Sequence, residues 1–260
     1  MKHSELNLYK QNSQKITCLT AYDASMAKLF DNAGIDIILV GDSLGMVIQG
    51  DENTRSVSMN DMLYHTSIVA NACNDALIIA DMPFNSYDNP QDALTNAKAL
   101  IDHGARMVKI EGGNEHSEVI KKLISNNINV CGHLGLQPQL VINSGDYRVK
   151  GRDENSAQLI INDAALLESL GVTALVLECI PGDLAKTVSE KINIPTIGIG
   201  AGSDCDGQVL VSYDMLGITT GKQPRFVRNF LKTQNSISEA VKSYILEVKA
   251  GTFPSKSESY

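Results

Sequence analysis

Residues 35–43 read IDIILVGDS, a β-branched apolar run that ends in a glycine and an acidic residue. The apolar part is continuous rather than alternating, which is typical of a strand buried on both faces in a parallel sheet covered by helices. Similar runs recur along the chain. We predict strands at Ile16–Leu19, Ile35–Val40, Leu77–Ala80, Met107–Ile110, Ile128–Cys131, Ala174–Leu177, Thr196–Ile199 and Gln208–Val211.

Helical patterns lie between these strands. We predict helices at Ser25–Ala33, Asn60–Asn71, Pro90–His103, Ser117–Asn126, Gln158–Leu170, Leu184–Lys191 and Ser236–Ala250. This alternation predicts an α/β fold, a (β/α)8 TIM barrel formed as a single domain over residues 1–260, with a polar and frayed C-terminal tail. A doubly wound open sheet is the structural alternative, although no GxGxxG motif follows the first strand. The long irregular segments Leu44–Met59 and Gln137–Arg152 are expected to act as lids.

The composition restricts the class of protein and its partners. The chain has 260 residues, 43% hydrophobic and 20% charged, which is typical of a globular protein. Its formal net charge is −8 and it has no basic run, so nothing favours a nucleic-acid or membrane partner, and we expect small-molecule partners. The five cysteines show no CxxC spacing, and no secretory signal is recognised. We therefore expect a cytoplasmic protein.

Polar side chains lie at or just after the ends of several predicted strands. They are Asp42, Asp81, Lys109, Glu111 and Glu178. The C-terminal ends of barrel strands meet at one face, so these side chains should come together there. Carboxylates held together repel, and Mg2+ relieves this by taking oxygen ligands from one or two carboxylates, waters and the substrate. We predict a Mg2+ site with Asp42 and Asp81 as direct ligands and Glu111 acting through a water.

Each of these residues also has a purely structural interpretation. A single Asp after a strand commonly caps a helix or forms a turn. Lys109 and Glu111 are two positions apart and share one strand face, so they could form a structural ion pair. His133 is either a support for the metal ligands or a satisfied core histidine. The segment Gly200-Ala201-Gly202 either cradles a phosphate or makes a tight turn.

A set of short motifs occurs in order between about Thr17 and Leu231. It includes Thr20-Ala21-Tyr22-Asp23, Val40-Gly41-Asp42-Ser43-Leu44-Gly45-Met46, Tyr64-His65-Thr66, Ala80-Asp81-Met82-Pro83-Phe84, Val108-Lys109-Ile110-Glu111-Gly112-Gly113, Gly132-His133-Leu134-Gly135-Leu136, Leu177-Glu178-Cys179 and Gly198-Ile199-Gly200-Ala201-Gly202. Together these motifs resemble the ketopantoate hydroxymethyltransferase family over nearly the whole chain.

The resemblance implies a barrel of the phosphoenolpyruvate/pyruvate type and a one-carbon transferase. The family transfers a hydroxymethyl group from its co-substrate 5,10-methylenetetrahydrofolate to 3-methyl-2-oxobutanoate through a Mg2+-stabilised enolate. The product is 2-dehydropantoate (ketopantoate), on the route to pantothenate and coenzyme A. The resemblance also implies a homo-oligomer, with a decamer as the expected form. The family's oxo-acid contacts fall on Asp42, Ser43, Asp81 and Lys109, its metal-associated residues on Asp42, Asp81 and Glu111, and its proton acceptor on Glu178.

The chain departs from the family pattern in both predicted lids. The departures are Arg55-Ser56-Val57-Ser58 and Gly145-Asp146-Tyr147, so folate contacts are not assigned. Two other functions stay open. A Mg2+-dependent 2-oxo acid lyase or mutase of the isocitrate lyase type would use similar chemistry, but it usually carries a lid cysteine, which both predicted lids lack. A non-catalytic oxo-acid binding module would need the metal ligands but not Glu178.

Overall fold

A computed structural model describes residues 5–142, 147–221 and 223–260, and within them parallel strands close into a barrel in sequential order. The strands are β1 Ile16–Thr20, β2 Ile37–Val40, β3 Leu77–Asp81, β4 Met107–Glu111, β5 Val130–Gly135, β6 Ala174–Glu178, β7 Thr196–Ile199 and β8 Gly207–Leu210. The helices are α1 Leu6–Gln11, α2 Ala24–Ala33, α3 Met59–Ala72, α4 Pro90–Asp102, α5 Ser117–Ile124, α6 Glu154–Leu170, α7 Gly182–Lys191, α8 Ser212–Met215 and α9 Ile237–Lys249. Because β1 pairs with β8, the predicted barrel is confirmed and the open sheet is excluded.

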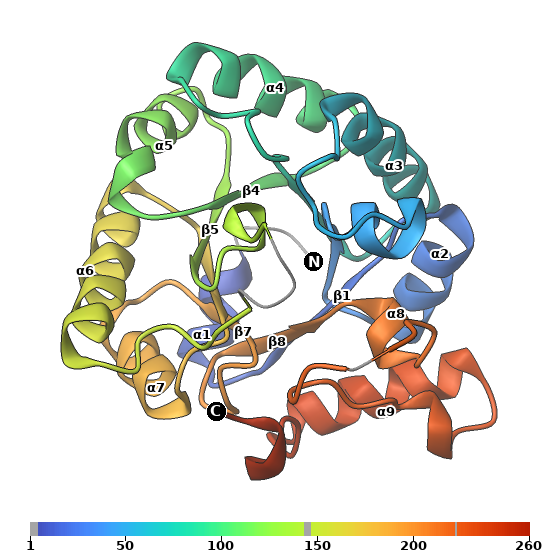
Figure 1. Cartoon of the computed structure of the whole chain (residues 1–260). Coiled ribbons are helices and arrows are strands. Elements are labelled where there is room, and N and C mark those ends of the chain that lie inside the picture. Colours follow the sequence, from blue (N-terminus) through green and yellow to red (C-terminus); the bar gives the residue numbers. More distant parts are fainter. Residues whose placement is uncertain (1–4, 143–146, 222) are drawn as a thin grey trace.

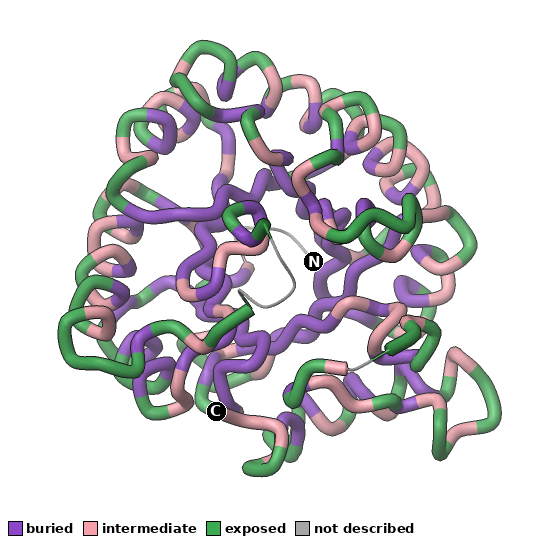
Figure 2. Tube along the Cα trace, viewed as in Figure 1, coloured by how far each residue is buried: buried purple, intermediate pink, exposed green. Residues whose placement is uncertain are grey.

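The helices surround the barrel, as Figure 1 shows for α2 to α7, and α9 packs beside α2 and β1. Burial follows this arrangement, because the strands and the inward sides of the helices are buried while the outer sides are exposed (Figure 2). The strand residues are all buried except Gly135 and Glu178, which are partly exposed. Both lie at the C-terminal ends of their strands, which are the ends where chemistry occurs in such barrels.

Side-chain caps and glycines set several helix boundaries. Asp23 accepts hydrogen bonds from the backbone N–H groups at the start of α2. The Asp153 side chain accepts a hydrogen bond from the Ser156 N–H, which starts α6 at Glu154 rather than at the predicted Gln158. A left-handed glycine, Gly171, with φ 96°, follows the last residue of α6 as predicted.

The strand boundaries differ from the prediction mainly at the polar ends. Strands β3, β4 and β6 run through Asp81, Glu111 and Glu178, which the sequence placed just beyond them. The backbone at these residues still pairs with a neighbouring strand, so a polar side chain does not end the strand. Strand β5 is displaced toward the C-terminus, because Ile128 is buried but precedes the paired residues. The short helices α1 and α8 were not predicted.

The C-terminal segment packs on the protein, so the expectation of a frayed tail is wrong. Phe253 is 3% exposed and makes an edge-to-face contact with Phe230. Arg228 forms an ion pair with Glu258, with Nε 2.6 Å from Oε1. Aromatic and ionic contacts to residues earlier in the chain therefore hold a segment whose own composition is polar.

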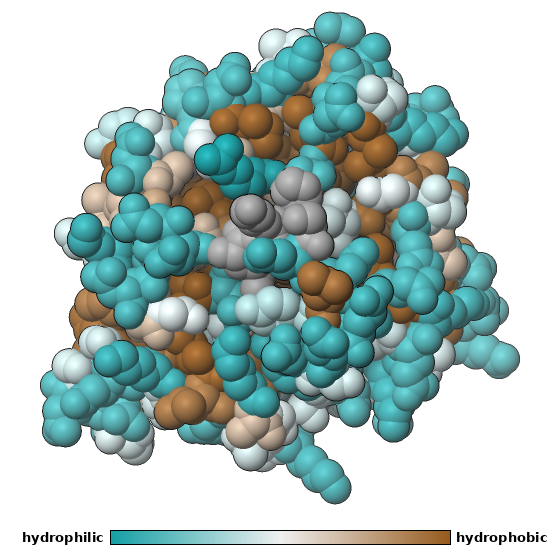
Figure 3. All heavy atoms as spheres, turned by 180° about the vertical axis from the view of Figure 1, so that it is seen from behind, coloured by the Kyte–Doolittle hydropathy of each residue, from teal (hydrophilic) through white to brown (hydrophobic). Residues whose placement is uncertain are grey.

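The surface is mixed in character. Seen from the side opposite to Figure 1, hydrophilic side chains separate smaller groups of hydrophobic ones (Figure 3). Among the helices in the described part of the chain, none combines the length and the apolar character that a membrane crossing requires.

Helix α9 carries a side chain that joins the strands where the barrel closes. The fully buried Tyr244 donates its hydroxyl to the carbonyl oxygens of Cys18 in β1 and Gln208 in β8, both at 2.9 Å. We expect Tyr244→Phe to lower the free energy of unfolding by about 1–3 kcal/mol, because buried acceptors lose a donor. Urea unfolding measures this. Tyr9→Phe, which removes a longer 3.4 Å contact to Asp36, is the control and should cost less; equal losses would contradict the prediction.

Candidate active site

Inward-facing side chains change from apolar to polar along the barrel axis. The interior is lined by Cys18, Ile37, Leu39, Ile79, Lys109, Cys131, Ala174, Val176, Ile197 and Val209. Two positions further along their strands, and so on the same face, lie Asp81, Glu111, His133 and Glu178. The alternation of side chains along the strands therefore places four ionisable groups at one mouth, above an interior that is apolar except for Lys109.

Asp81 and Lys109 form a buried ion pair across β3 and β4. Lys109 Nζ lies 2.7 Å from Asp81 Oδ1, and the two residues are partners in the strand register. Burial lowers the pKa of Lys109, but the charges of Asp81, Glu111 and Asp42 raise it above its usual value overall. The ion pair of Lys109 is thus made with Asp81 on the neighbouring strand, not with Glu111 as the structural alternative supposed.

Asp42 follows β2 and lies beside this pair. Its backbone N–H donates to Asp81 Oδ2 at 3.0 Å, and its carboxylate accepts a hydrogen bond from Gln139. Burial raises the pKa of Asp42 well above its usual range, and the charges of Asp81 and Glu111 raise it further. A carboxylate in this position needs a cation if it is to stay ionised. The next residue, Ser43, places its Oγ 2.9 Å from the Tyr22 hydroxyl.

His133 lies between two carboxylates. Its Nδ1 is 3.5 Å from Glu111 Oε1 and its Nε2 is 3.2 Å from Glu178 Oε2, which are ionic contacts rather than well-aligned hydrogen bonds. Burial and Lys109 lower the pKa of His133, but its contacts with Glu111 and Glu178 raise it to about 9. The structure therefore brings together every site residue named from the sequence, and His133 joins the Glu111 side of the cluster to the Glu178 side.

The donor set fits a hard divalent cation. Four acidic side chains, those of Asp42, Asp81, Glu111 and Glu178, lie with the two basic side chains of Lys109 and His133, so acidic groups outnumber basic ones in the cluster. In the described part of the chain, no group of three or more His, Cys, Asp or Glu side chains is spaced to hold a metal. Two carboxylates suffice for Mg2+, which keeps waters and takes substrate oxygens. Asp42 and Asp81 are the candidate pair because they are adjacent, with the Asp42 N–H donating to Asp81 Oδ2. All three carboxylates already have protein partners, since Lys109 contacts Asp81, Gln139 donates to Asp42 and to Glu111, and His133 contacts Glu111.

The two predicted lids contact each other beside this cluster. Segment 44–59 contains a π-helical turn, Gly45–Gln49, and reaches the second lid where Arg55 Nη1 donates to the Gln139 carbonyl oxygen at 2.9 Å. Tyr147 Oη also lies 3.7 Å from Met46 Sδ. The family departure at Gly145-Asp146 falls on residues 143–146, which lie outside the described residues. Sequence reasoning missed Gln139 because an amide in an irregular segment carries no periodic or motif signal.

The glycines after β7 make a tight turn. Gly200 has φ 62°, and a Cβ there would lie 2.6 Å from Phe226 Cδ1. Gly202 has φ 76°, and its Cβ would lie 3.1 Å from the Gly182 Cα. Both the backbone conformation and the close packing require glycine, which favours the structural interpretation over a phosphate cradle.

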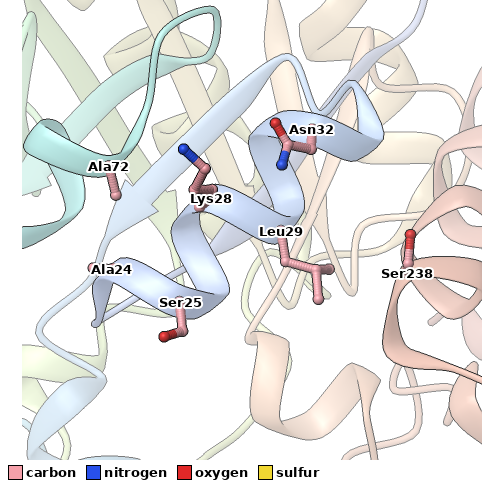
Figure 4. A pocket seen from close by; sticks show the side chains of 7 residues that line it. All are labelled: Ala24, Ser25, Lys28, Leu29, Asn32, Ala72 and Ser238. Atoms are coloured by element: carbon pink, nitrogen blue, oxygen red, sulfur yellow. The ribbon is translucent and has the colours of Figure 1, made fainter.

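A hollow also lies on the outer surface, around α2 (Figure 4). It is lined by Ala24, Ser25, Lys28, Leu29, Asn32, Ala72 and Ser238. Lys28 is the single ionisable side chain among them, so the hollow offers no acid–base pair or ligand set. The barrel mouth is the better candidate for a catalytic site.

Solved structures with a similar fold include two enzymes in complex with small molecules. Oxaloacetate acetylhydrolase in complex with 3,3-difluorooxalacetate aligns with a TM-score of 0.64 at 12% identity, covering 96% of each chain. Phosphonopyruvate hydrolase in complex with oxalate and Mg++ aligns with a TM-score of 0.63 at 14% identity, covering 81% of each chain. Identities this low show the shared barrel fold and nothing about the reaction.

Comparison of sequences is more specific. The family model described as ketopantoate hydroxymethyltransferase matches residues 1–256. The 3-methyl-2-oxobutanoate hydroxymethyltransferase of Ruthia magnifica subsp. Calyptogena magnifica is 59% identical over 260 residues, which is 100% of both chains. That of Shewanella sediminis (strain HAW-EB3) is 51% identical over 257 residues, covering 99% of this chain and 97% of that protein. The chain thus belongs to the ketopantoate hydroxymethyltransferase family and is a transferase.

Proposed function

We propose that this protein transfers a hydroxymethyl group from 5,10-methylenetetrahydrofolate to 3-methyl-2-oxobutanoate, giving 2-dehydropantoate with the help of Mg2+. One observation carries the proposal: an ion pair, two further carboxylates and a candidate base converge at the C-terminal ends of β2 to β6. Family membership supports the choice of oxo acid and product. The folate co-substrate and the metal are our inference from the family and from the chemistry of the cluster.

Asp42 and Asp81 would hold the metal, and Glu111 would act on it through a water. Bound there, Mg2+ would act as a Lewis acid that stabilises the enolate charge on the substrate's keto oxygen. Lys109 supplies a compact buried cation that offsets the charge of the oxo acid. The Ser43 hydroxyl, 2.9 Å from the Tyr22 hydroxyl, would contact the same substrate.

Glu178 is the proposed base for the C3 proton of the oxo acid. Its side chain is 13% exposed and lies at the partly open end of β6, whereas Glu111 and Asp81 are more deeply buried. His133 contacts Glu178 at 3.2 Å and can fix the direction in which its carboxylate points. Removal of the C3 proton leaves a carbon nucleophile that forms the new C–C bond to the one-carbon unit. Water supplies the hydroxyl oxygen as the bond from that carbon to the folate nitrogen breaks, so the second product is tetrahydrofolate.

The location and assembly of the protein are further parts of this proposal. All five cysteines are free, as a reducing cytoplasm would keep them. A homo-oligomer, with a decamer as the expected form, rests on the family resemblance and is tested by light scattering on the purified protein. Apart from further copies of this chain, small molecules are the only partners we propose.

Product analysis tests this function against its alternatives. The protein is incubated with 3-methyl-2-oxobutanoate, 5,10-methylenetetrahydrofolate and Mg2+, and products are identified by mass spectrometry. We expect 2-dehydropantoate, and its formation should stop with excess chelator and resume when Mg2+ is restored. A lyase or mutase would cleave or rearrange an oxo acid without folate, and a binding module would bind the oxo acid without converting it. Full activity in chelator would remove the metal from the proposal.

A further inference from the structure

Gln139 occupies an unusual position between the proposed metal ligands. It lies in the short 3₁₀ turn Pro138–Leu140 after β5 and is 2% exposed. Its Nε2 donates to Asp42 Oδ2 at 2.7 Å, while its backbone N–H donates to Glu111 Oε2 at 3.0 Å. One residue from an irregular segment therefore holds carboxylates that come from two different parts of the barrel.

The amide of Gln139 can take only one orientation. Nε2 faces Asp42 Oδ2 and also the carbonyl oxygen of Met82 at 2.9 Å, and both of these groups are acceptors. The Gln139 Oε1 in turn accepts from the Tyr87 hydroxyl at 2.5 Å. A flipped amide would set an oxygen against two acceptors, so the direction of the hydrogen bond to Asp42 is fixed by its surroundings.

The backbone of Gln139 is fixed as well. Arg55 Nη1 donates to the Gln139 carbonyl oxygen at 2.9 Å, and the Arg55 guanidinium stacks 3.7 Å from the centre of the Phe84 ring. At the start of the same segment, the Leu136 N–H donates to the Glu178 carbonyl oxygen at 2.9 Å. The segment that carries the Gln139 donors is thus held by the first predicted lid and by the strand that carries the proposed base.

We propose that Gln139 is a positioning residue that orients the carboxylates of Asp42 and Glu111 for cation binding. This inference rests on the proposed function, since it concerns the same metal site. A neutral donor at Asp42 Oδ2 orients the carboxylate without adding a charge that would compete with the cation. Hydrogen-bonding partners of metal ligands typically contribute about 10–100-fold to metal affinity.

Gln139→Leu tests the proposal, because it removes the amide and keeps the backbone donor and a similar volume. We expect Mg2+ to bind about 10–100-fold more weakly by isothermal titration calorimetry. The thermal midpoint of the metal-free variant should change less than that of the Mg2+-saturated one, and saturating Mg2+ should restore much of the lost turnover. The same substitution at the partly exposed Gln137 is the matched control and should leave Mg2+ affinity unchanged.

A second variant keeps the test decisive if Gln139→Leu does not fold. Tyr87→Phe leaves the ring in place but removes the hydroxyl that fixes the amide, and it should weaken Mg2+ binding in the same direction. Unchanged Mg2+ affinity in a folded Gln139→Leu protein would overturn the role of Gln139 and leave the proposed function standing. If the leucine variant is unfolded, unchanged Mg2+ affinity in Tyr87→Phe would have the same meaning. If the unsubstituted protein binds no Mg2+, the metal in the proposed function fails instead.

Discussion

Glu178→Gln should reduce turnover by about 10²–10⁴-fold, the range that general-base catalysis typically contributes. Glutamine has nearly the same shape as glutamate but cannot accept the C3 proton as an anion does. Lys109, Asp81 and Asp42 are unaltered, so binding of the oxo acid and of Mg2+ should persist. The variant thus separates a catalyst from a binding module, because only a catalyst depends on Glu178.

Exchange of the C3 hydrogen reports the first chemical step directly. In deuterated water without folate, NMR should show loss of the C3 proton of 3-methyl-2-oxobutanoate with the unsubstituted protein and little loss with Glu178→Gln. Glu118→Gln is the matched control, since Glu118 lies on the surface of α5, 77% exposed, and pairs with Lys121. Undiminished exchange in Glu178→Gln would assign the base to another group, and His133, 3.2 Å away, would be tested next.

Asp81→Asn should lower metal-dependent turnover by about a thousandfold or more. Lewis-acid stabilisation by a bound metal is worth several kcal/mol, and each 1.4 kcal/mol is a factor of ten in rate. The variant also removes the charge opposite Lys109, the largest contribution that raises the pKa of that lysine, so this pKa should fall. The free energy of unfolding should fall by less than the roughly 3–5 kcal/mol typical of breaking a buried pair, because Asp42 and Glu111 remain nearby.

Calorimetry with Mg2+ measures the loss of metal binding, and an activity titration against Mg2+ measures the loss of turnover. Asp153→Asn is the matched control, because asparagine caps a helix as well as aspartate does and Asp153 lies at the start of α6. We expect the control to behave like the unsubstituted protein. Normal Mg2+ affinity in Asp81→Asn would show that Asp81 is not a metal ligand.

The barrel was predictable because its strands are buried on both faces, and strands buried in this way appear in the sequence as continuous apolar runs. A run such as Ile37–Val40 has no polar residue that could face water. What escaped prediction depended on contacts between distant residues. The polar C-terminal tail is held by Phe253 and by the pair between Arg228 and Glu258, and short α8 has too few residues to show a period.

The candidate site also has residues that the sequence predicts and contacts that it does not. Asp81, Lys109, Glu111 and Glu178 lie on regular strands, so alternation and strand order were enough to predict that they meet at one mouth. Partners could not be predicted, because they depend on strand register: Lys109 pairs with Asp81 across β3 and β4. Gln139 reaches Asp42 from a turn 97 residues away, and nothing local in the sequence marks such a contact.

The largely apolar lining of the barrel interior shapes the electrostatic field of the ionised groups at the mouth above it. Aliphatic side chains such as Ile79, Val176 and Ile197 polarise little, so field lines from the ionised groups are directed toward the open end rather than spread through the protein. Mobile ions of the buffer can approach these groups from that end only. Because acidic groups outnumber basic ones at this mouth, the attraction felt by a cation should weaken with salt during its approach, and far less once the cation is seated.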